Sequence, residues 1–415
     1  MTSLLSRIGP ARIAAVATFI FITGVAGTRP LVPLHGVTLG IGAAELGVLV
    51  AVFALVSAFL TTTYGRWLDR RGSIGAMIAS TAVTAFGLLL PALFPDRTGL
   101  YLSQLIAGSG MTGYILAGQK FAGQLSGDLR QRERNVAQLT MCVALGGLVG
   151  PPVAGLIGDT LGFLVAFSVL AIVSLCASVP LLFLLREEGR RRAAKAGTDP
   201  APGPAGQSGF APLRVFGYHP YLGRSFLISA LVLMGKDLYI AYFPLYAIQV
   251  GMSATVIGAM IALHNAGAVA VRVFMLPLAR MFGKNLVILV TVVASGLFFL
   301  AMPLSADIRL LAALSLALGL SLGLGQPLAM TTSINLAPRD KVGEVLGFRL
   351  SINRITQVLA PLSFAAVAGL TGVVGIFFVI GGTMLAGAFR IRIPDTAEVE
   401  AQQAAPRRDT GRSPD

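Results

Sequence analysis

Charged side chains are scarce in this chain. Asp, Glu, Lys and Arg make up only 12% of its 415 residues, and the mean hydropathy is +0.79. Average soluble domains carry about 25% charged residues, so this composition excludes an ordinary soluble globular protein. The chain also has only three histidines and two cysteines, with no spacing typical of a disulfide framework or a metal site. We therefore expect no bound metal and no cofactor. No G-x-x-x-x-G-K-[ST] sequence occurs, which argues against ATP hydrolysis as an energy source.

Long apolar runs recur from one end of the sequence to the other. Each is about 20 residues long, which is the length that a helix needs to cross roughly 30 Å of hydrocarbon. Barrel strands would instead alternate polar and apolar residues over about ten positions. The sequence therefore predicts an all-α membrane protein with twelve transmembrane helices, near residues 12–33, 44–64, 75–95, 100–120, 137–157, 163–185, 225–248, 255–278, 285–304, 309–331, 344–367 and 372–390.

Basic residues are concentrated in alternate connections between these spans. Arginine or lysine precedes span 1 and follows spans 2, 4, 6, 8 and 10, whereas the other connections contain only Arg97 and Arg309. By the positive-inside rule this pattern predicts a multi-pass protein of the plasma membrane, the inner membrane of a bacterial cell, with cytoplasmic N- and C-termini. The net charge of +14 then requires no nucleic-acid partner, because the charges are scattered over separate loops.

The two halves of the chain resemble one another. A stretch rich in Gly, Pro, Ala and basic residues separates spans 6 and 7 and is typical of a flexible linker. We therefore expect an N-terminal six-helix bundle at 1–185, a cytoplasmic linker at 186–220, a C-terminal six-helix bundle at 221–392 and a disordered cytoplasmic tail at 393–415. Five pairs recur at a spacing of 211 residues: Pro33 and Pro244, Gly40 and Gly251, Gly47 and Gly258, Gly72 and Gly283, and Gly108 and Gly319. This repeat predicts two pseudo-symmetric bundles with the same orientation in the membrane.

The stretch GRWLDRRG lies between spans 2 and 3. This stretch, together with the six plus six spans and the long central loop, makes the chain resemble the major facilitator superfamily of secondary transporters. Gly65, Asp69, Arg70 and Gly72 match the family's loop pattern, while Ser and Ile replace the basic pair that ends it. The resemblance implies a cytoplasmic gate that holds the halves together when the cavity opens outward. Because Asp69 can bind a helix N-terminus or a cation, we expect the start of span 11 and Arg349 as its partners.

A second motif, GGLVGPPVAG, lies in span 5. Gly146, Gly150, Pro151 and Gly155 resemble a pattern that in this superfamily is associated with antiporters that export drugs and metabolites. Ala154 replaces the first glycine of the pattern's closing pair. Independently of the resemblance, small residues four apart provide a smooth surface for close helix contact, and Pro151 permits bending.

Few ionisable residues lie inside the predicted spans. A charge at the centre of a bilayer costs roughly 2.5–3.5 kcal/mol on insertion scales, so such residues tend to face a cavity and to have partners. Asp237 is the only carboxylate near the middle of a predicted helix. Lys236 points about 100° away from it around the helix, so we expect Arg354 or Arg29 to pair with Asp237. Arg272 and Arg349 lie near the cytoplasmic surface, where snorkelling accounts for them equally well.

These residues define a candidate cavity for substrate and coupling ion. Its expected members are Arg29, Lys236, Asp237, Tyr239, His264, Asn265 and Arg354. The ionisable residues of the spans comprise five cations and one anion, a balance that favours anionic or polar-acidic solutes. His264 can equally well bond to a neighbouring helix, and Asp237 can be either a proton carrier or a structural partner.

The predicted function is secondary active transport of a small organic solute by alternating access. We expect proton-coupled efflux, an antiport, of a drug-like molecule or an anionic metabolite. Proton-coupled uptake, a channel and an integral-membrane enzyme are the alternatives, and the last lacks the surface cluster of His, Asp, Glu or Cys that it would need. The expected partners are the solute, protons and the lipid bilayer, and the expected state is a monomer.

Overall fold

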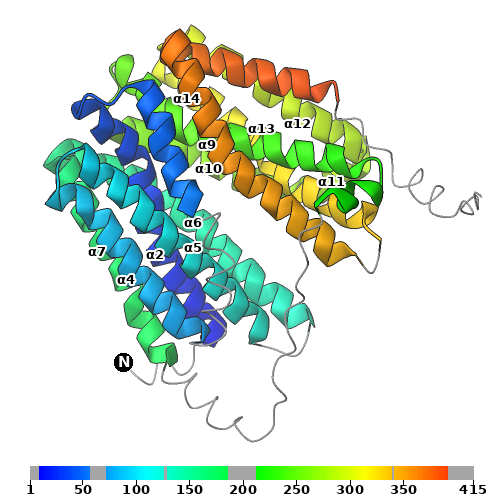
Figure 1. Cartoon of the computed structure of the whole chain (residues 1–415), viewed down its shortest axis with the longest axis horizontal. Coiled ribbons are helices and arrows are strands. Elements are labelled where there is room, and N and C mark those ends of the chain that lie inside the picture. The colour runs from blue at the N-terminus through cyan, green and yellow to red at the C-terminus, as the bar shows by residue number, and fades with distance from the viewer. Residues whose placement is uncertain (1–8, 57–71, 126–128, 186–211, 339–340, 391–415) are drawn as a thin grey trace, which may run out of the picture.

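The described part of the chain is built from helices. The computed structural model describes residues 9–56, 72–125, 129–185, 212–338 and 341–390, and within these ranges it contains no strand. Figure 1 shows one bundle built from each half of the chain. The helices of the first half are α2 (Pro10–Thr38), Ala43–Val56, α4 (Ser73–Leu93), α5 (Arg97–Gln124), α6 (Leu129–Leu161) and α7 (Phe163–Cys176). After a turn at Ala177 the last of these continues to Leu185.

The second half repeats this arrangement. Its elements are η1 (Pro212–Gly217), α9 (Leu222–Gln249), α10 (Ala254–Val273), α11 (Met275–Phe282), α12 (Lys284–Ala301), η2 (Met302–Leu304), α13 (Ile308–Leu336) and α14 (Val342–Ala388). The backbone of α14 leaves the helical region at Gly372, whose φ of 69° divides this element into two helices. η1 falls within the expected linker, yet its Val215 is buried against Phe226 of α9 and Val345 of α14.

The order of these helices confirms the predicted all-α fold with twelve spans. Nine helices of the described residues are long and apolar enough to cross a membrane, with α14 counted as one. α5, which carries Ser103, Gln104 and Thr112, does not reach that hydropathy, and Ala43–Val56 is shorter than the others. α5 nevertheless packs against α4, and Phe53 of Ala43–Val56 lies against Gly108 of α5, so both segments belong to the first bundle and complete its six segments.

Two predicted boundaries were wrong. The span expected at 255–278 breaks at Phe274, between α10 and α11. Pro277 explains the break, since its ring would clash with the carbonyl group of Val273 if the helix continued. The gap expected between 367 and 372 is reduced to the single residue Gly372, because a glycine with positive φ can turn the chain without a loop.

The two halves are related by a structural repeat. Six glycines have positive φ among the described residues, and they form three pairs: Gly40 with Gly251, Gly72 with Gly283, and Gly162 with Gly372. The members of the first two pairs are 211 residues apart, and those of the third are 210 apart. Equivalent turns therefore adopt the same unusual backbone conformation in both halves, as a duplicated six-helix unit predicts.

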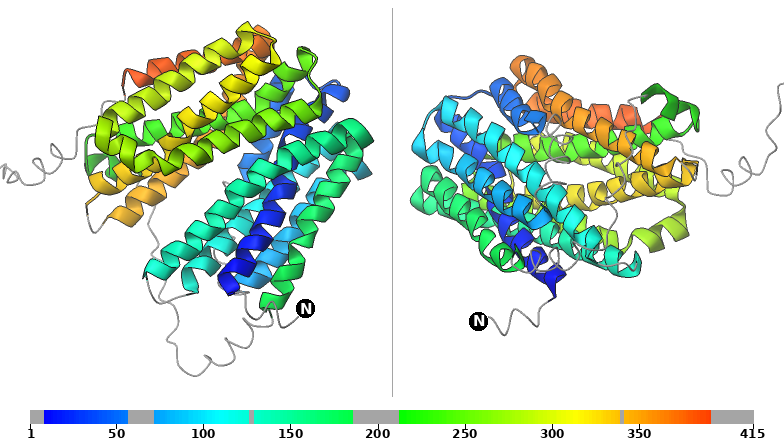
Figure 2. Two further views of the ribbon diagram at one scale, coloured as in Figure 1. Left: turned by 180° about the vertical axis from the view of Figure 1, so that it is seen from behind. Right: turned by 60° about the horizontal axis from the view of Figure 1, so that its bottom comes forward.

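The halves meet at one end of the molecule and diverge toward the other, as the views in Figures 1 and 2 show. We call the end that carries Asp159 and Ala254 the closed end, and the end that carries Arg134 and Lys341 the open end. At the closed end α6 packs against α10, and Ala43–Val56 packs against α14. A shared apolar core joins the halves there, with Leu31 and Leu34 of α2 packed in one cluster with residues of α9.

An interhalf cap stabilises the closed end. Asp159 of α6 accepts hydrogen bonds from the backbone N–H groups of Ala254 and Thr255 at 2.9 and 2.7 Å and from the Thr255 hydroxyl at 2.6 Å. These groups form the first turn of α10. A carboxylate of the first half therefore satisfies the free N–H groups at the start of a helix of the second half.

Candidate functional site

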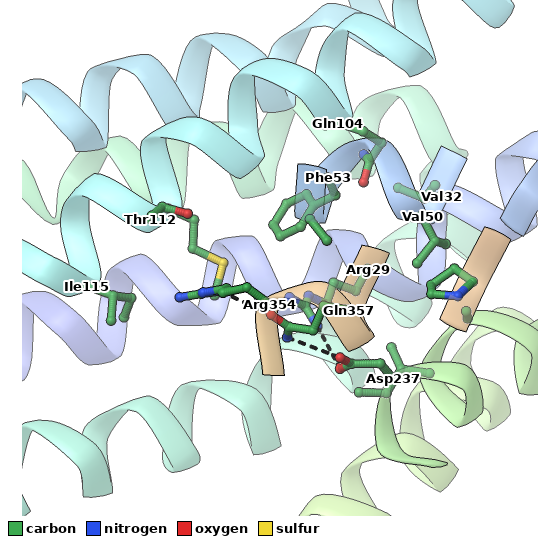
Figure 3. A pocket seen from close by; sticks show the side chains of 15 residues that line it. Arg29, Val32, Val50, Phe53, Gln104, Thr112, Ile115, Asp237, Arg354 and Gln357 are labelled. Carbon is green, nitrogen blue, oxygen red and sulfur yellow. Dashed lines mark hydrogen bonds and ion pairs between the residues drawn. The ribbon is translucent and has the colours of Figure 1, made fainter. Parts of the chain in front are cut away.

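A cavity lies between the two halves. It measures about 960 Å³ with its open mouth included, and it is bordered by α2, Ala43–Val56 and α5 from the first half and by α9 and α14 from the second. Its polar lining consists of Arg29, Gln104, Thr112, Asp237, Arg354 and Gln357 (Figure 3). Val32, Val50, Phe53, Ile240 and Pro361 are among its apolar lining residues. Pockets that bind small molecules have this combination of mostly apolar walls and a few polar groups.

Helical spacing explains how each element contributes its lining residues. Asp237, Ile240 and Ala241 follow the i, i+3, i+4 pattern on α9, so they occupy one face of that helix. Arg354 and Gln357 are three apart on α14 and likewise share a face. The cavity therefore forms where one face of each helix meets the others, without any loop.

Asp237 is the centre of a polar network that joins the halves. Its Oδ1 lies 4.0 Å from Nη1 of Arg29, which belongs to α2 of the first half. Its Oδ2 accepts a hydrogen bond of 3.1 Å from Nε2 of Gln357. The Oε1 atom of Gln357 in turn accepts a 3.0 Å bond from Nη1 of Arg354. Figure 3 shows Gln357 between Arg354 and Asp237. Both arginines expected to pair with Asp237 are thus present, Arg29 as a direct ion pair and Arg354 through Gln357.

Arg29 and Lys236 add positive charge near Asp237. The Arg29 guanidinium lies 5.1 Å from the centre of the Phe53 ring, a cation–π distance. Lys236, which is not among the lining residues, interacts electrostatically with Asp237, Arg29 and Arg272. The region is therefore positively charged, and Asp237 is the one carboxylate among the described residues that line the cavity.

Besides Lys236, three residues expected in the cavity are not among its lining residues. Tyr239 is fully buried, and its hydroxyl donates a 2.8 Å bond to Ser315. His264 is also buried and stacks on Tyr239, with ring centres 4.5 Å apart. Asn265 donates a 2.8 Å bond to the carbonyl oxygen of Gly147 and so links α10 to α6. These positions indicate packing and contact between the halves, and none of the three residues lines the cavity.

The glycines of the second motif lie at close helix contacts. A Cβ on Gly146 would be 2.9 Å from the carbonyl oxygen of Phe19, and one on Gly150 would clash with the carbonyl oxygen of Thr23. Both contacts join α6 to α2. Another face of α6 contacts α10. There Gly155 lies too close to Ala254 to accept a side chain, and the Pro151 carbonyl lies against Gly258 of α10. The motif thus allows α6 to pack closely on a helix of each half.

The expected cytoplasmic gate falls mostly outside the described residues. This applies to Gly65, Asp69 and Arg70, whereas Gly72 directly precedes α4 with a φ of 86°. Arg349 is buried, and its Nη2 donates to the carbonyl oxygen and to Oε1 of Gln326 at 3.1 and 2.7 Å. Burial with these bonds distinguishes Arg349 from a snorkelling side chain.

Sequence reasoning missed the neutral polar residues. Gln357 connects Arg354 to Asp237, and Gln326 holds Arg349 while it also bonds to Ser229. The sequence could have indicated Gln357, since it follows Arg354 by three residues and therefore shares its helical face. Within the described residues no group of His, Cys, Asp and Glu could hold a metal ion.

Comparisons with known proteins identify the family. Multidrug resistance protein 2 of Bacillus subtilis is 22% identical over 270 residues, which cover 64% of this chain and 64% of the relative. The class D tetracycline resistance protein of Salmonella ordonez is 28% identical over 181 residues, covering 43% and 45%. In both comparisons the chain spans less than two thirds of the relative's length.

The fold is also that of a solved transporter. The crystal structure of the nucleoside transporter NupG matches with a TM-score of 0.75 at 14% identity, over 92% of this chain and 99% of the other. The family model of the Major Facilitator Superfamily matches residues 14–253 and 225–414, which together span nearly the whole chain. The chain therefore belongs to the Major Facilitator Superfamily.

Proposed function

We propose that this protein is a secondary active exporter that moves a small amphiphilic organic solute, drug-like or anionic, across the plasma membrane by alternating access. The observation that carries the proposal is the cavity between the halves, whose ion pair joins Arg29 of one half to Asp237 of the other. A rocking motion that separates the halves at the closed end must change this pair. Events in the cavity are thereby coupled to the conformation.

The direction of the open end follows from the sequence. The described residues that flank the basic connections lie at the end that carries Arg134 and Lys341, and the positive-inside rule assigns that end to the cytoplasm. The conformation then opens to the cytoplasm, where an exporter takes up its solute. The loop with Gly65, Asp69 and Arg70 would close this side in the opposite state, with Arg349 near its docking site.

Efflux is supported by the relatives, whose names refer to multidrug and tetracycline resistance. In this scheme Asp237 carries the proton that returns inward as the solute leaves. The proposal assigns the chain no enzymatic reaction and takes a monomer as the working unit. It also keeps 1–185 and 221–392 as the two moving bodies.

The test is transport in membrane vesicles. A proton gradient is imposed across everted vesicles that contain the protein. The accumulation of fluorescent drugs and organic acids inside them is then measured with and without an uncoupler. We expect gradient-dependent accumulation of at least one compound, and its loss in Asp237→Asn at unchanged protein level. Accumulation that is unaffected by the uncoupler would contradict proton coupling, and equal loss of protein and transport in the variant would reduce Asp237 to a structural partner.

Uptake with a proton is the second candidate, and one feature favours it. Protonation of Asp237 would release Arg29 from the ion pair, so that a solute anion and a proton could bind together. The same vesicles distinguish the two directions. A symporter would accumulate the solute in right-side-out vesicles with an acidic exterior, whereas the exporter would do so only in everted ones.

A further inference from the structure

The charges that line the cavity are not balanced. Asp237 neutralises Arg29, with which it forms an ion pair at 4.0 Å, while Arg354 takes part in no ion pair among the described residues. Its bond of 3.0 Å goes to the neutral amide oxygen of Gln357. Two cationic side chains on the cavity wall thus share one carboxylate within the described part of the protein, and Arg354, which interacts with Asp237 only at longer range, forms no close ion pair.

The position of Arg354 makes it accessible to a ligand. Figure 3 shows its side chain extending away from Asp237, toward Thr112 and Ile115 on the α5 side of the cavity. A guanidinium presents its donors in a planar fork that matches a carboxylate at two points. Arg354 uses one donor nitrogen for Gln357, so a second edge of the fork is available to a bound molecule.

The rest of the wall determines the other part of the ligand. Val32, Val50, Phe53 and Ile240 surround the polar network, and such side chains favour an aromatic or branched aliphatic group, which gains from removal of its apolar surface from water. A single uncompensated lining cation matches one negative charge. A phosphate monoester, with nearly two charges at neutral pH, would exceed it.

We propose that the cavity binds monocarboxylates with an apolar body, with the carboxylate on Arg354 and the body against Phe53 and Ile240. Asp237 acts as an internal competitor, because its own carboxylate occupies Arg29, the second guanidinium that the ligand could use. This substrate class deepens the transporter function proposed above, on which it rests, and it holds for either direction of transport.

Binding to the purified full chain in nanodiscs of zwitterionic lipid tests the proposal directly. Calorimetry is carried out with 2-naphthoate, its neutral isostere 2-naphthamide, and 2-naphthyl phosphate. We expect naphthoate to bind about tenfold or more tightly than the amide, and more tightly than the phosphate. Equal affinities for naphthoate and the amide, or a preference for the phosphate, would overturn the assignment.

Two variants of the cavity give opposite predictions. Arg354→Gln removes the charge and should weaken naphthoate binding about 10- to 100-fold, the range expected for a hydrogen bond to a charged group, with partial recovery in Arg354→Lys. Asp237→Asn frees Arg29 and should tighten binding several-fold. Arg309→Gln is the matched control, since Arg309 is exposed at the start of α13 and outside the cavity. Unchanged affinity in Arg354→Gln would refute the site, and this variant decides alone if Asp237→Asn does not fold.

Failure of this inference can be distinguished from failure of the transporter function. Gradient-driven accumulation of neutral or cationic compounds with no binding of naphthoate would overturn the anion site and leave the transporter. Binding of naphthoate that follows the predicted variant pattern, in a protein that moves no compound in vesicles, would leave the site and overturn the transporter.

Discussion

Loss of the interhalf cap should shift the protein away from the conformation described above. Asp159 satisfies three donors at the start of α10, at 2.6 to 2.9 Å. Replacement of an N-cap side chain by alanine typically costs about 1 kcal/mol, within a range of about 0.5–2, and the lost charge at the helix N-terminus accounts for about 0.3–1 of this in exposed positions. Because Asp159 is exposed, we expect about 1 kcal/mol for Asp159→Ala.

This cost falls on one conformation only. The bonds cross from α6 to α10, so they exist while the closed end is closed and are lost when the halves separate there. A change of about 1 kcal/mol then alters the ratio of the two conformations about fivefold. Thr255→Val removes only the hydroxyl bond and leaves both backbone bonds, so its effect should be smaller.

Distances between spin labels measure the shift. In a cysteine-free background, labels at Leu161 and Ala306 report separation of the halves at the closed end, and labels at Arg134 and Lys341 report the open end. We expect Asp159→Ala to increase the population with a long closed-end distance and a short open-end distance.

Asp307→Ala is the matched control for this experiment. Asp307 caps α13 by accepting from the N–H groups of Arg309 and Leu310 at 2.7 and 3.1 Å, within a single half. It should lower the thermal stability without a change in either distance distribution. Identical distributions in Asp159→Ala and the unmodified protein, or a shift of the same size in Asp307→Ala, would refute the reasoning.

Two further predictions concern packing. Tyr239→Phe should lower the free energy of unfolding by about 1 kcal/mol, because it removes the hydrogen bond to Ser315. Transport should stay unchanged, since the hydroxyl group lies outside the cavity. A large loss of transport at normal stability would instead place Tyr239 in the functional site. Gly150→Ala should destabilise the fold by about 1–3 kcal/mol, because the new Cβ would clash with the carbonyl oxygen of Thr23. Gly147→Ala is the control and should be tolerated, since its Cβ would lie 3.9 Å from the nearest atom. Thermal unfolding in detergent compares the two glycine variants, and equal melting temperatures would contradict the close-contact role of the motif.

The fold could be predicted because hydrophobic length is a direct requirement of the bilayer. Helices that cross it must satisfy their own backbone groups and be about 20 residues long, so the order of spans follows from the sequence. Boundaries depend on single residues whose effect is local. Pro277 ends α10 early, and Gly372 replaces a loop, and hydropathy is insensitive to both.

The centre of the site could be predicted in part. Asp237 was identifiable because a carboxylate is costly inside a span and needs a cation, and Arg29 and Arg354 were the available cations at similar depth. The rotation of α9 was not identifiable. Its buried residues lie all around the helix, so no apolar stripe indicates which face meets the cavity. The inclusion of Tyr239 in the cavity followed from this ambiguity.

The repeat also separates packing from chemistry. A Cβ on Gly47 would lie 2.6 Å from the carbonyl oxygen of Pro361, and one on its counterpart Gly258 would clash with the carbonyl oxygen of Pro151. Pro151 and Pro361 are 210 residues apart, close to the spacing of the repeat. The contacts that bring the halves together at the closed end are therefore nearly symmetric, and each half supplies one glycine and one proline.

The charges do not follow this symmetry. At the spacing of 211 residues, Arg29 corresponds to Ile240 and Asp237 corresponds to Ala26. Symmetric contacts alone would stabilise both bundles in the same way and would leave nothing at the centre that responds to a proton or a solute. Since the two members of the ion pair come from different halves and neither is duplicated, a change in charge at Asp237 acts on one contact between the halves. We infer that duplication supplied the bundle and its close-packed contacts, whereas the response to ligand and proton depends on residues that only one copy carries.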